Sequence, residues 1–255
     1  MSISCLCITY LRTSLLEEAI ECFLRQTYKG PKELIIINDA EDQYLEFNHP
    51  EVFIFNTNRR FRTIGEKRNA SVALSKYDYL AVWDDDDIFL PHRLEYCFNK
   101  IQKYGLDYYK LEEAFFCENN IIKKICSNLY FSSSIFSRKL YSVLEGHGCI
   151  NSGQDAYLES QVWQSYFNKK CNMLIEGLNH RFPGIRDKKI SKKDIYYMYR
   201  WGESYNLSLT GKKLNALDIV SKERRKKEKQ SGHIKLNPHW KKNYTQICQN
   251  FIDSF

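Results

Sequence analysis

Residues 79–91, YLAVWDDDDIFLP, place four consecutive aspartates directly after an apolar run. Short apolar runs of this kind are typical of buried strands. Neighbouring carboxylates a few Å apart repel each other by about 1–4 kcal/mol per pair, depending on screening by water. Asp84, Asp85, Asp86 and Asp87 therefore either form a solvated acidic turn or are compensated by a bound cation and its anionic ligand. The apolar residues on both sides favour the bound cation.

The first 105 residues alternate between strand and helix patterns. Strand-like runs cover residues 3–10, 33–39, 52–55 and 79–83, and helical patterns begin near Ser14, Gly65 and Pro91, the last ending at Gly105. Strands that alternate with helices predict a parallel, βα-wound sheet. Such sheets bind ligands at the carboxyl ends of their strands. Because Thr9, Asp39 and the four aspartates all lie at such ends, we expect them to converge.

Beyond Gly105 the pattern changes. The sequence predicts a hairpin or meander around Asn119-Asn120, a helix over residues 155–167 and a loop over residues 200–211. Residues 221–230, SKERRKKEKQ, form a charged stretch with few apolar side chains.

Composition limits the class of protein. With 255 residues, 43% of them hydrophobic and 15% aromatic, the chain is expected to fold as one large or two small globular domains. The first residues lack a basic leader, and no apolar stretch reaches the roughly 18 residues of a membrane span, so we expect neither signal peptide nor transmembrane segment. The nine cysteines include no CxxC pair or zinc-ligand spacing, which favours a reducing, cytoplasmic location.

The net charge of +7 lies in the last part of the chain. Residues 211–255 contain 11 Lys or Arg against 4 Asp or Glu, so the preceding residues balance to zero. Such a basic stretch is either a solvated charged helix or a surface for an anionic polymer, a membrane or nucleic acid. It lacks the apolar face of a membrane anchor.

Carboxylate clusters are ligands for hard divalent cations such as Mg²⁺, Mn²⁺ or Ca²⁺. On an extended backbone, Asp84 and Asp86 project to one face and Asp85 and Asp87 to the other. One face would thus offer two carboxylates to a metal ion or to a metal-bound diphosphate. The spacing of an EF-hand calcium loop is absent.

A basic segment lies upstream, over residues 58–69, NRRFRTIGEKRN. Its cationic side chains are Arg59, Arg60, Arg62, Lys67 and Arg68. Basic groups beside a helix N-terminus suit a diphosphate, and an ordinary exposed loop is the alternative. The GxxxxGK[ST] pattern of a P-loop is missing.

Four motifs together resemble family 2 glycosyltransferases with the GT-A fold. They are ITYLR (residues 8–12), ELIIINDAED (33–42), GEKRNASVALSKYDYLAVWDDDD (65–87) and IFLPHRLE (88–95). The resemblance implies an α/β fold with a GT-A-type, Rossmann-like mixed sheet and flanking helices, a smaller acceptor-side β/α region and a basic helical C-terminal tail. It divides the chain into a nucleotide-sugar half (1–105), an acceptor and catalytic-base half of the same domain (106–210) and a basic extension (211–255).

The resemblance assigns nucleotide contacts to residues near the first strands. Thr9 and Arg12 are similar to residues that close around the nucleotide, and Arg68 is similar to a basic residue that contacts it. Asp39 resembles the acid that hydrogen-bonds the base, usually uracil. The family commonly carries Asn where this chain has Leu11, so the first motif departs from the pattern there.

The acidic positions receive separate roles by resemblance. Asp84 and Asp86 match the family's DxD motif, with Asp84 toward the ribose and the metal and Asp86 toward the metal. Either Asp85 or Asp87 could share this work, and Asp85 is the candidate for a nucleotide-sugar contact. The implied cofactor is Mn²⁺ or Mg²⁺. Asp155 matches the catalytic base, which takes the proton from the acceptor hydroxyl. Gln154 replaces the Glu that often precedes this base, and capping of its own helix is the alternative role of Asp155.

Residues 199–211, YRWGESYNLSLTG, resemble a segment that often carries a His near the diphosphate and metal. Asn206 is its counterpart here, and Glu203 is a candidate substitute. Trp201 is expected either to form a wall of the site or to belong to the core.

The resemblance implies an inverting, metal-dependent hexosyl- or pentosyltransferase. Its donor would be a nucleoside diphosphate sugar, with UDP favoured, and its acceptor a hydroxyl of a glycan or polysaccharide. A hydroxymethylated DNA base is the alternative acceptor, because the basic tail suits nucleic acid. A sugar-phosphate nucleotidyltransferase is disfavoured because ITYLRTS lacks a glycine-rich loop. A non-catalytic nucleotide-binding module is a third interpretation.

Overall fold

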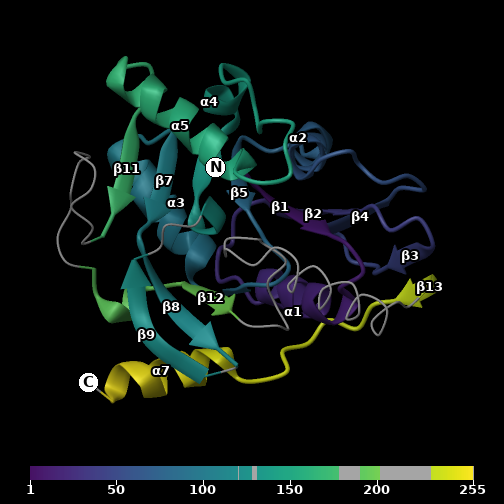
Figure 1. Ribbon diagram of the computed structural model, residues 1–255. Coiled ribbons are helices and arrows are strands. Elements are labelled where there is room, and N and C mark those ends of the chain that lie inside the picture. Colours follow the sequence, from purple (N-terminus) through teal and green to yellow (C-terminus); the bar gives the residue numbers. More distant parts are fainter. Residues whose placement is uncertain (120, 128–130, 178–189, 202–230, 255) are drawn as a thin grey trace.

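A seven-stranded mixed sheet forms the centre of the molecule (Figure 1). The computed structural model describes residues 1–119, 121–127, 131–177, 190–201 and 231–254. In spatial order the strands are β11 (Met173–Glu176), β7 (Tyr108–Leu111), β10 (Ile135–Ser137), β5 (Tyr79–Val82), β1 (Ile3–Thr9), β2 (Lys32–Asn38) and β4 (Val52–Asn56). Neighbouring strands are parallel, except that β10 runs antiparallel to β5 and β7.

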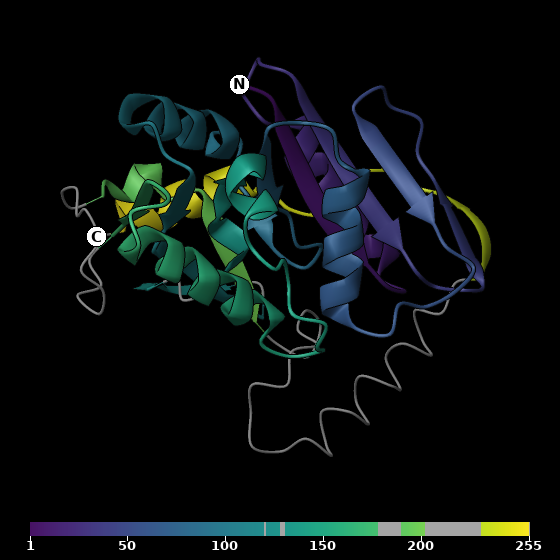
Figure 2. The same cartoon turned by 90° about the horizontal axis from the view of Figure 1, so that it is seen from above.

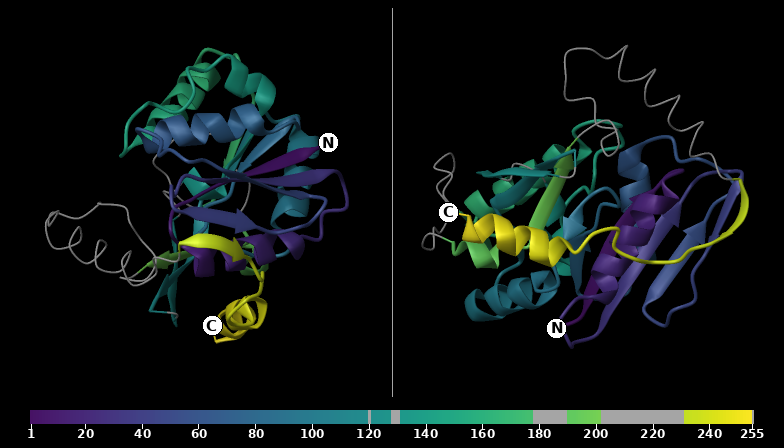
Figure 3. Two further views of the ribbon diagram at one scale, coloured as in Figure 1. Left: turned by 90° about the vertical axis from the view of Figure 1, so that its right-hand side faces the viewer. Right: turned by 90° about the horizontal axis from the view of Figure 1, so that it is seen from below.

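Helices cover both faces of this sheet (Figures 2 and 3). The helices α1 (Thr13–Leu24) and α3 (Arg93–Tyr104) pack on one face, and α2 (Ile64–Leu74), α4 (Arg138–Ser142) and α5 (Gln154–Phe167) pack on the other. Successive strand residues point to opposite faces. Cys5 and Cys7 of β1 therefore join the core beneath α1, whereas Leu6 joins the core beneath α2. Burial on both faces explains why these strands read as continuous apolar runs.

A second sheet of four strands continues from the first. Its order is β6 (Ile88–Phe89), β12 (Tyr197–Trp201), β8 (Glu113–Glu118) and β9 (Ile121–Ser127). The hairpin β8–β9 turns at Asn119, whose φ of 50° lies in the left-handed region that Asn tolerates. Two 3₁₀ turns, η1 (Phe131–Ser133) and η2 (Lys192–Asp194), precede β10 and β12. The chain passes from the first sheet to the second between β5 and β6, where the four aspartates lie.

The C-terminal segment, residues 231–254, returns across the molecule. Its strand β13 (Gly232–Lys235) pairs in parallel with β3 (Gln43–Glu46), and the chain then runs past α1 to the helix α7 (Tyr244–Asp253), which packs beside β9 (Figures 1 and 3). The backbone N–H of Asn237 donates to Glu17 of α1, at 2.8 Å. This segment thus ties the first helix to the second sheet.

The predicted mixed α/β sheet with flanking helices is confirmed. The strands expected in the first 105 residues are present, and α3 ends at Gly105 in a left-handed conformation. The sequence did not indicate β3, β6, β11, β12 or β13, whereas β10 lies within the segment expected to form a hairpin or meander. The predicted loop over 200–211 is wrong for Arg200 and Trp201, which end β12; its remaining residues and the charged stretch 221–230 lie outside the described residues.

Within the described part of the chain, no helix has the length and apolar character that crossing a bilayer requires.

Candidate active site

The four aspartates, residues 84–87, form the connection between β5 and β6, called the acidic turn below. The prediction of an extended backbone over the four aspartates is wrong. β5 ends at Val82, and Asp85 and Asp86 form a turn, because the chain must leave one sheet and enter the other within this short connection. The four carboxylates therefore meet partners from several different elements.

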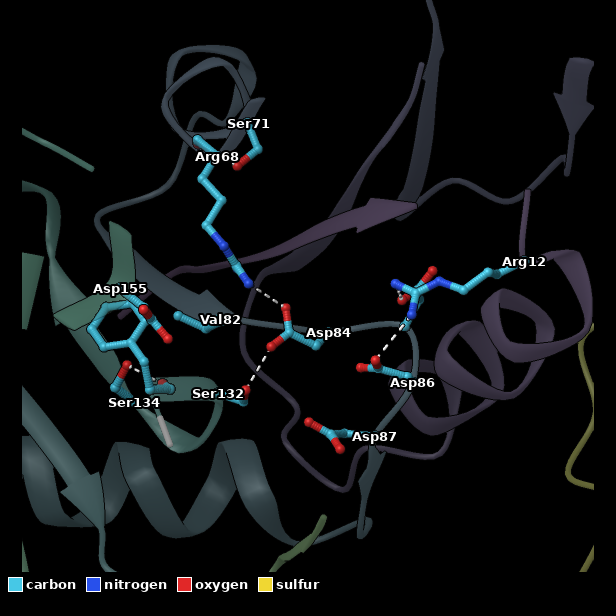
Figure 4. Close-up of polar contacts among 12 residues, drawn as sticks. Arg12, Arg68, Ser71, Val82, Asp84, Asp86, Asp87, Ser132, Ser134 and Asp155 are labelled. Carbon is cyan, nitrogen blue, oxygen red and sulfur yellow. Dashed lines mark hydrogen bonds and ion pairs between the residues drawn. The ribbon is translucent and has the colours of Figure 1, made fainter. Parts of the chain in front are cut away.

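Asp84 lies between the α2 helix and the η1 turn (Figure 4). Arg68 Nη2 donates to its Oδ1 at 2.7 Å, and Ser132 Oγ donates to its Oδ2 at 2.5 Å. Burial alone would raise the pKa of Asp84, but the charge of Arg68 and these hydrogen bonds outweigh it and hold the pKa below its usual value. Asp84 is therefore a fixed, ionised carboxylate.

Arg12, at the N-terminus of α1, bridges the middle of the acidic turn. Its Nη1 donates to Asp86 Oδ2 at 2.9 Å, and its Nη2 forms an ion pair with Asp85. Burial raises the pKa of Asp85 to about 6, against the opposing charge of Arg12. Asp86 remains 18% exposed, whereas Asp85 is buried. Asp86 is thus the more accessible of the two carboxylates that Arg12 holds.

Asp87 faces β12 rather than solvent. Tyr197 Oη donates to its Oδ2 at 2.7 Å, and the backbone N–H of Arg200 donates to its Oδ1 at 3.3 Å. Burial, together with repulsion from Asp86 and Asp84, raises the pKa of Asp87 well above its usual range. Asp87 therefore fastens the turn to the second sheet and is poorly placed to meet a ligand.

The chain's own arginines compensate part of the repulsion within the acidic turn. Arg12 and Arg68 form ion pairs with three of the four aspartates. The expectation that a bound cation and its anionic ligand alone offset this charge is therefore corrected. The two guanidinium groups come from opposite sides of Asp84, as Figure 4 shows, so they also flank the space in front of the turn.

A pocket of roughly 140 Å³ lies beside the carboxyl ends of β1 and β2. Its lining residues are Tyr10, Leu11, Asp39, Ala40, Glu41, Asp42 and Arg60. Asp39 is held by an ion pair with buried Lys67 and by the backbone N–H of Phe61 at 3.2 Å. Lys67 also donates to the carbonyl of Thr9. Burial lowers the pKa of Lys67, although the charge of Asp39 opposes this.

Two features of this pocket were not predicted. The guanidinium of Arg60 lies 3.7 Å from the centre of the Tyr10 ring, in a cation–π contact that forms a flat wall. Leu11 has a φ of 53°, in the left-handed region. Asn tolerates that conformation much better than a branched residue does, which gives a physical reason for the Asn that the family commonly carries there.

Asp155 lies in the first turn of α5. Its Oδ1 accepts from the N–H of Ala156 at 2.9 Å, and its side chain is half-buried. Gly153, and not Asp155, occupies the N-cap position, so the alternative role as the N-cap is wrong. Burial would lower the pKa of Arg68, but the charge of Asp84 and, to a smaller extent, the charge of Asp155 raise it above its usual value.

The loop before α5 is docked on the N-terminus of α2. The N–H of Gly65 donates to the carbonyl of Ile150 at 3.2 Å, and a methyl group at Gly65 would overlap the carbonyl of Gly148. Asn69 exchanges two hydrogen bonds with the backbone of His147, at 2.8 and 2.9 Å. The same helix that supplies Arg68 to Asp84 therefore also sets where α5 begins.

The structure brings most of the sequence-predicted site residues to one edge of the main sheet. Thr9, Arg12, Asp39, Arg68, Asp84, Asp85, Asp86 and Asp155 lie at or beside the carboxyl ends of β1, β2 and β5. The basic segment does not form one patch, because Lys67 and Arg68 turn to different acids and Arg60 covers Tyr10. Asn206 and Glu203 lie outside the described residues.

The sequence reasoning missed Ser132, Tyr197 and Arg200. Ser132 lies in a run of serines that gave no signal. Arg200 is a single charge inside the apolar run IYYMYRW, and a charge in such a run almost always has a specific partner when it is buried. Trp201 packs against the main core, in line with the core alternative.

The fold is that of a GT-A-like glycosyltransferase. The structure of residues 1–349 of TarS from S. aureus superposes with a TM-score of 0.56 at 13% identity, covering 80% of this chain and 62% of that one. The same protein was solved in complex with UDP-GlcNAc, and that structure matches at a TM-score of 0.55 and 12% identity, covering 99% and 72%. At such identities the likeness concerns the fold, and it confirms the predicted fold class.

Residues 4–159 match the model of the family described as glycosyl transferase family 2. The chain belongs to this family, so the resemblance seen in its motifs is confirmed.

Two curated relatives are uncharacterized glycosyltransferases. YwdF from Bacillus subtilis (strain 168) is 32% identical over 124 residues, which are 47% of this chain and 46% of YwdF. A protein from Methanocaldococcus jannaschii is 35% identical over 86 residues, 31% and 30% of the two lengths. The matches thus span less than half of either relative.

Proposed function

We propose that the chain is a metal-dependent, inverting glycosyltransferase that moves a sugar from a nucleoside diphosphate, UDP being favoured, to a hydroxyl of a glycan. The observation that carries this proposal is the arrangement at one sheet edge. The acidic turn is flanked by Arg12 and Arg68, a pocket with a buried acid lies on one side, and Asp155 lies on the other.

The pocket beside Asp39 is the proposed site of the nucleobase. An ionised carboxylate there accepts from the N3–H of uracil, while cytosine offers no hydrogen at that ring nitrogen. Lys67 and the N–H of Phe61 fix the orientation of Asp39. The ring of Tyr10, backed by Arg60, offers a flat surface for stacking. Structures of TarS with UDP and UDP-GlcNAc accord with a uridine donor for this fold.

The acidic turn is the proposed site of the diphosphate and its cation. Asp84 and Asp86 each keep 18% of the side chain exposed, and carboxylate oxygens suit Mn²⁺ or Mg²⁺, so this donor set fits such an ion. When bound, the ion would stabilise the negative charge that develops on the leaving diphosphate. Arg12 and Arg68 are placed to donate to phosphate oxygens from either side.

Asp155 is the proposed general base. As the acceptor oxygen attacks the anomeric carbon, the new carbon–oxygen bond forms on the face opposite the diphosphate, and the bond to the nucleotide breaks. The acceptor proton passes to the carboxylate of Asp155. One base and one leaving group in line give inversion at the anomeric carbon.

The location and the acceptor complete the proposal. A cytoplasmic site of action suits the nine free cysteines, seven of which are buried. A glycan hydroxyl is the proposed acceptor. The alternative, a hydroxymethylated DNA base, rests on residues 221–230, outside the described residues, and would be recognised by DNA binding that weakens steeply with salt.

The test is to incubate the purified chain with a panel of UDP-sugars and Mn²⁺ and to measure UDP release. Slow release without acceptor, increased by the right glycan, is the expected result. Pyrophosphate formation from UTP and a sugar phosphate would instead indicate a nucleotidyltransferase. If the chain bound UDP tightly but formed no UDP from any UDP-sugar, with or without an acceptor, it would be a binding module.

A further inference from the structure

Arg200 is a fully buried arginine on β12 whose side chain contacts the backbone of the acidic turn. Its Nε donates to the carbonyl oxygen of Asp86 at 2.6 Å, and its own N–H donates to the carboxylate of Asp87 at 3.3 Å. Tyr197, on the same strand, holds the other oxygen of Asp87. The strand β12 thus holds both the backbone carbonyl of Asp86 and the side chain of its neighbour Asp87.

The charge of Arg200 is matched by Glu18 of α1. Arg200 Nη1 and Glu18 Oε2 are 2.7 Å apart, and each side chain is 1% exposed. Neither charge is stable at this depth without the other, because removal of one partner leaves an uncompensated buried charge. Burial would raise the pKa of Glu18, but the charge of Arg200 and the hydroxyl of Tyr244 outweigh it and keep the pKa below its usual value.

The C-terminal segment holds Glu18 from the other side. Tyr244, the first residue of α7, donates its hydroxyl to Glu18, and the N–H of Lys241 donates to the same carboxylate at 3.3 Å. The indole N–H of Trp240 meets Cys22 Sγ at 3.2 Å, and Arg25 stacks on the Trp240 ring at 4.5 Å. A continuous path therefore runs from α7 through Glu18 and Arg200 to Asp86.

We infer that Arg200 is a positioning residue for Asp86, oriented by Glu18 and Tyr244, so that the C-terminal segment is part of the donor site. This inference rests on the proposed function of the acidic turn. The direction of the Asp86 carboxylate follows from the orientation of its peptide, which Arg200 fixes. Because a buried guanidinium N–H needs an acceptor in any case, the variants below separate this role from a purely structural one.

The alternative, that the pair only joins α1, β12 and α7, makes a different prediction. In Arg200→Met, Glu18 loses its partner, and both stability and ligand binding suffer. The double variant Glu18→Gln/Arg200→Met removes both charges and is expected to regain stability. If the role were only structural, nucleotide binding would return together with stability.

The experiment is calorimetry of UDP binding in Mn²⁺ and in EDTA, with electron paramagnetic resonance of the bound Mn²⁺. We expect the double variant to melt near the wild type but to bind UDP at least tenfold more weakly in Mn²⁺. Its affinity in EDTA should stay within about threefold, because the base pocket is unchanged, and its Mn²⁺ spectrum should broaden. Wild-type affinity in Mn²⁺ would overturn the inference.

A milder variant keeps the test decisive if the double variant does not fold. Tyr244→Phe removes one hydroxyl without changing charge, and we expect a two- to fivefold weaker affinity for UDP in Mn²⁺ alone; an unchanged affinity would overturn the inference. The matched control is Lys100→Gln/Glu176→Gln, which removes an ion pair between the partly exposed Lys100 of α3 and the buried Glu176 of β11, a strand three positions from β5 in the main sheet. It should bind UDP like the wild type. If the wild type shows no Mn²⁺-dependent UDP binding, the proposed function fails, and this inference with it.

Discussion

The acidic turn and the start of α5 carry the two kinds of carboxylate in the candidate site, and they are held in opposite ways. Arginines and hydroxyls from α1, α2, η1 and β12 fix the four aspartates of the turn. Asp155 accepts from the N–H of its neighbour Ala156, and within the described residues no Lys, Arg or His forms an ion pair with it.

This contrast matches the two tasks. Carboxylates that bind a cation and a diphosphate must keep their charge and position, which is what close arginine partners provide. A general base must gain a proton during the reaction, and a tight ion pair would oppose that gain. The surrounding loop, rather than a counter-ion, therefore positions Asp155. Three substitutions probe this contrast.

Asp155→Asn should have the largest effect. The amide cannot take the acceptor proton, so kcat should fall about 10²- to 10⁴-fold, the usual contribution of a general base. UDP affinity in Mn²⁺ should stay within about twofold, because no described contact of the acidic turn depends on Asp155; steady-state kinetics and calorimetry measure the two quantities.

The matched control is Asp253→Asn, which removes an exposed carboxylate at the end of α7. It should leave both quantities unchanged. Equal turnover in Asp155→Asn and in this control would exclude Asp155 as the base and remove the contrast between the two regions.

Gly65→Ala should have an intermediate effect. The added methyl group meets the carbonyl of Gly148, so either α2 or the loop before α5 must move. Such overpacking costs about 1–3 kcal/mol of unfolding free energy, measured by urea titration. Since the loop carries α5, kcat should fall more than UDP affinity. Ala73→Ser, on the exposed face of the same helix, is the control; a kcat equal to that of the control would show that this contact does not position Asp155.

The smallest effect concerns pH and His147. Burial, together with the charge of Arg68, lowers the pKa of His147 to about 3. The unfolded chain binds a proton near pH 6.5 and the folded chain does not. The unfolding free energy should therefore fall as pH drops from about 6.5 toward 3, by at most about 1.4 kcal/mol per pH unit from this residue.

His147→Gln removes this contribution while keeping a polar side chain. Urea titrations at several pH values should show a shallower loss of stability in the variant than in the wild type. Identical slopes would mean that His147 titrates normally and that the loop before α5 is less tightly packed than its contacts indicate.

The sequence predicted what depends on neighbours in the chain. The runs that became β1, β2 and β5 are mostly apolar because both faces are buried, and Asp39 and Asp84 lie within two residues of the ends of β2 and β5. Asp155 was placed by a local motif.

Other parts depend on contacts between distant residues. Glu18 and Arg200 are 182 positions apart, and β3 pairs with β13, so no local pattern marks either contact. The turn at the acidic residues was mispredicted because β6 belongs to a different sheet from β5. The apolar residues after Asp87 do not indicate which sheet they join.

Calorimetry of UDP with the wild type and Asp86→Asn, each in Mn²⁺ and in EDTA, tests the role of the acidic turn most directly. The wild type should bind UDP at least tenfold more tightly in Mn²⁺ than in EDTA, a difference of about 1.4 kcal/mol or more. Asp86→Asn should lose that difference and retain the affinity seen in EDTA. Equal affinity of the wild type in Mn²⁺ and EDTA would contradict the assignment of the turn to a cation-bound diphosphate.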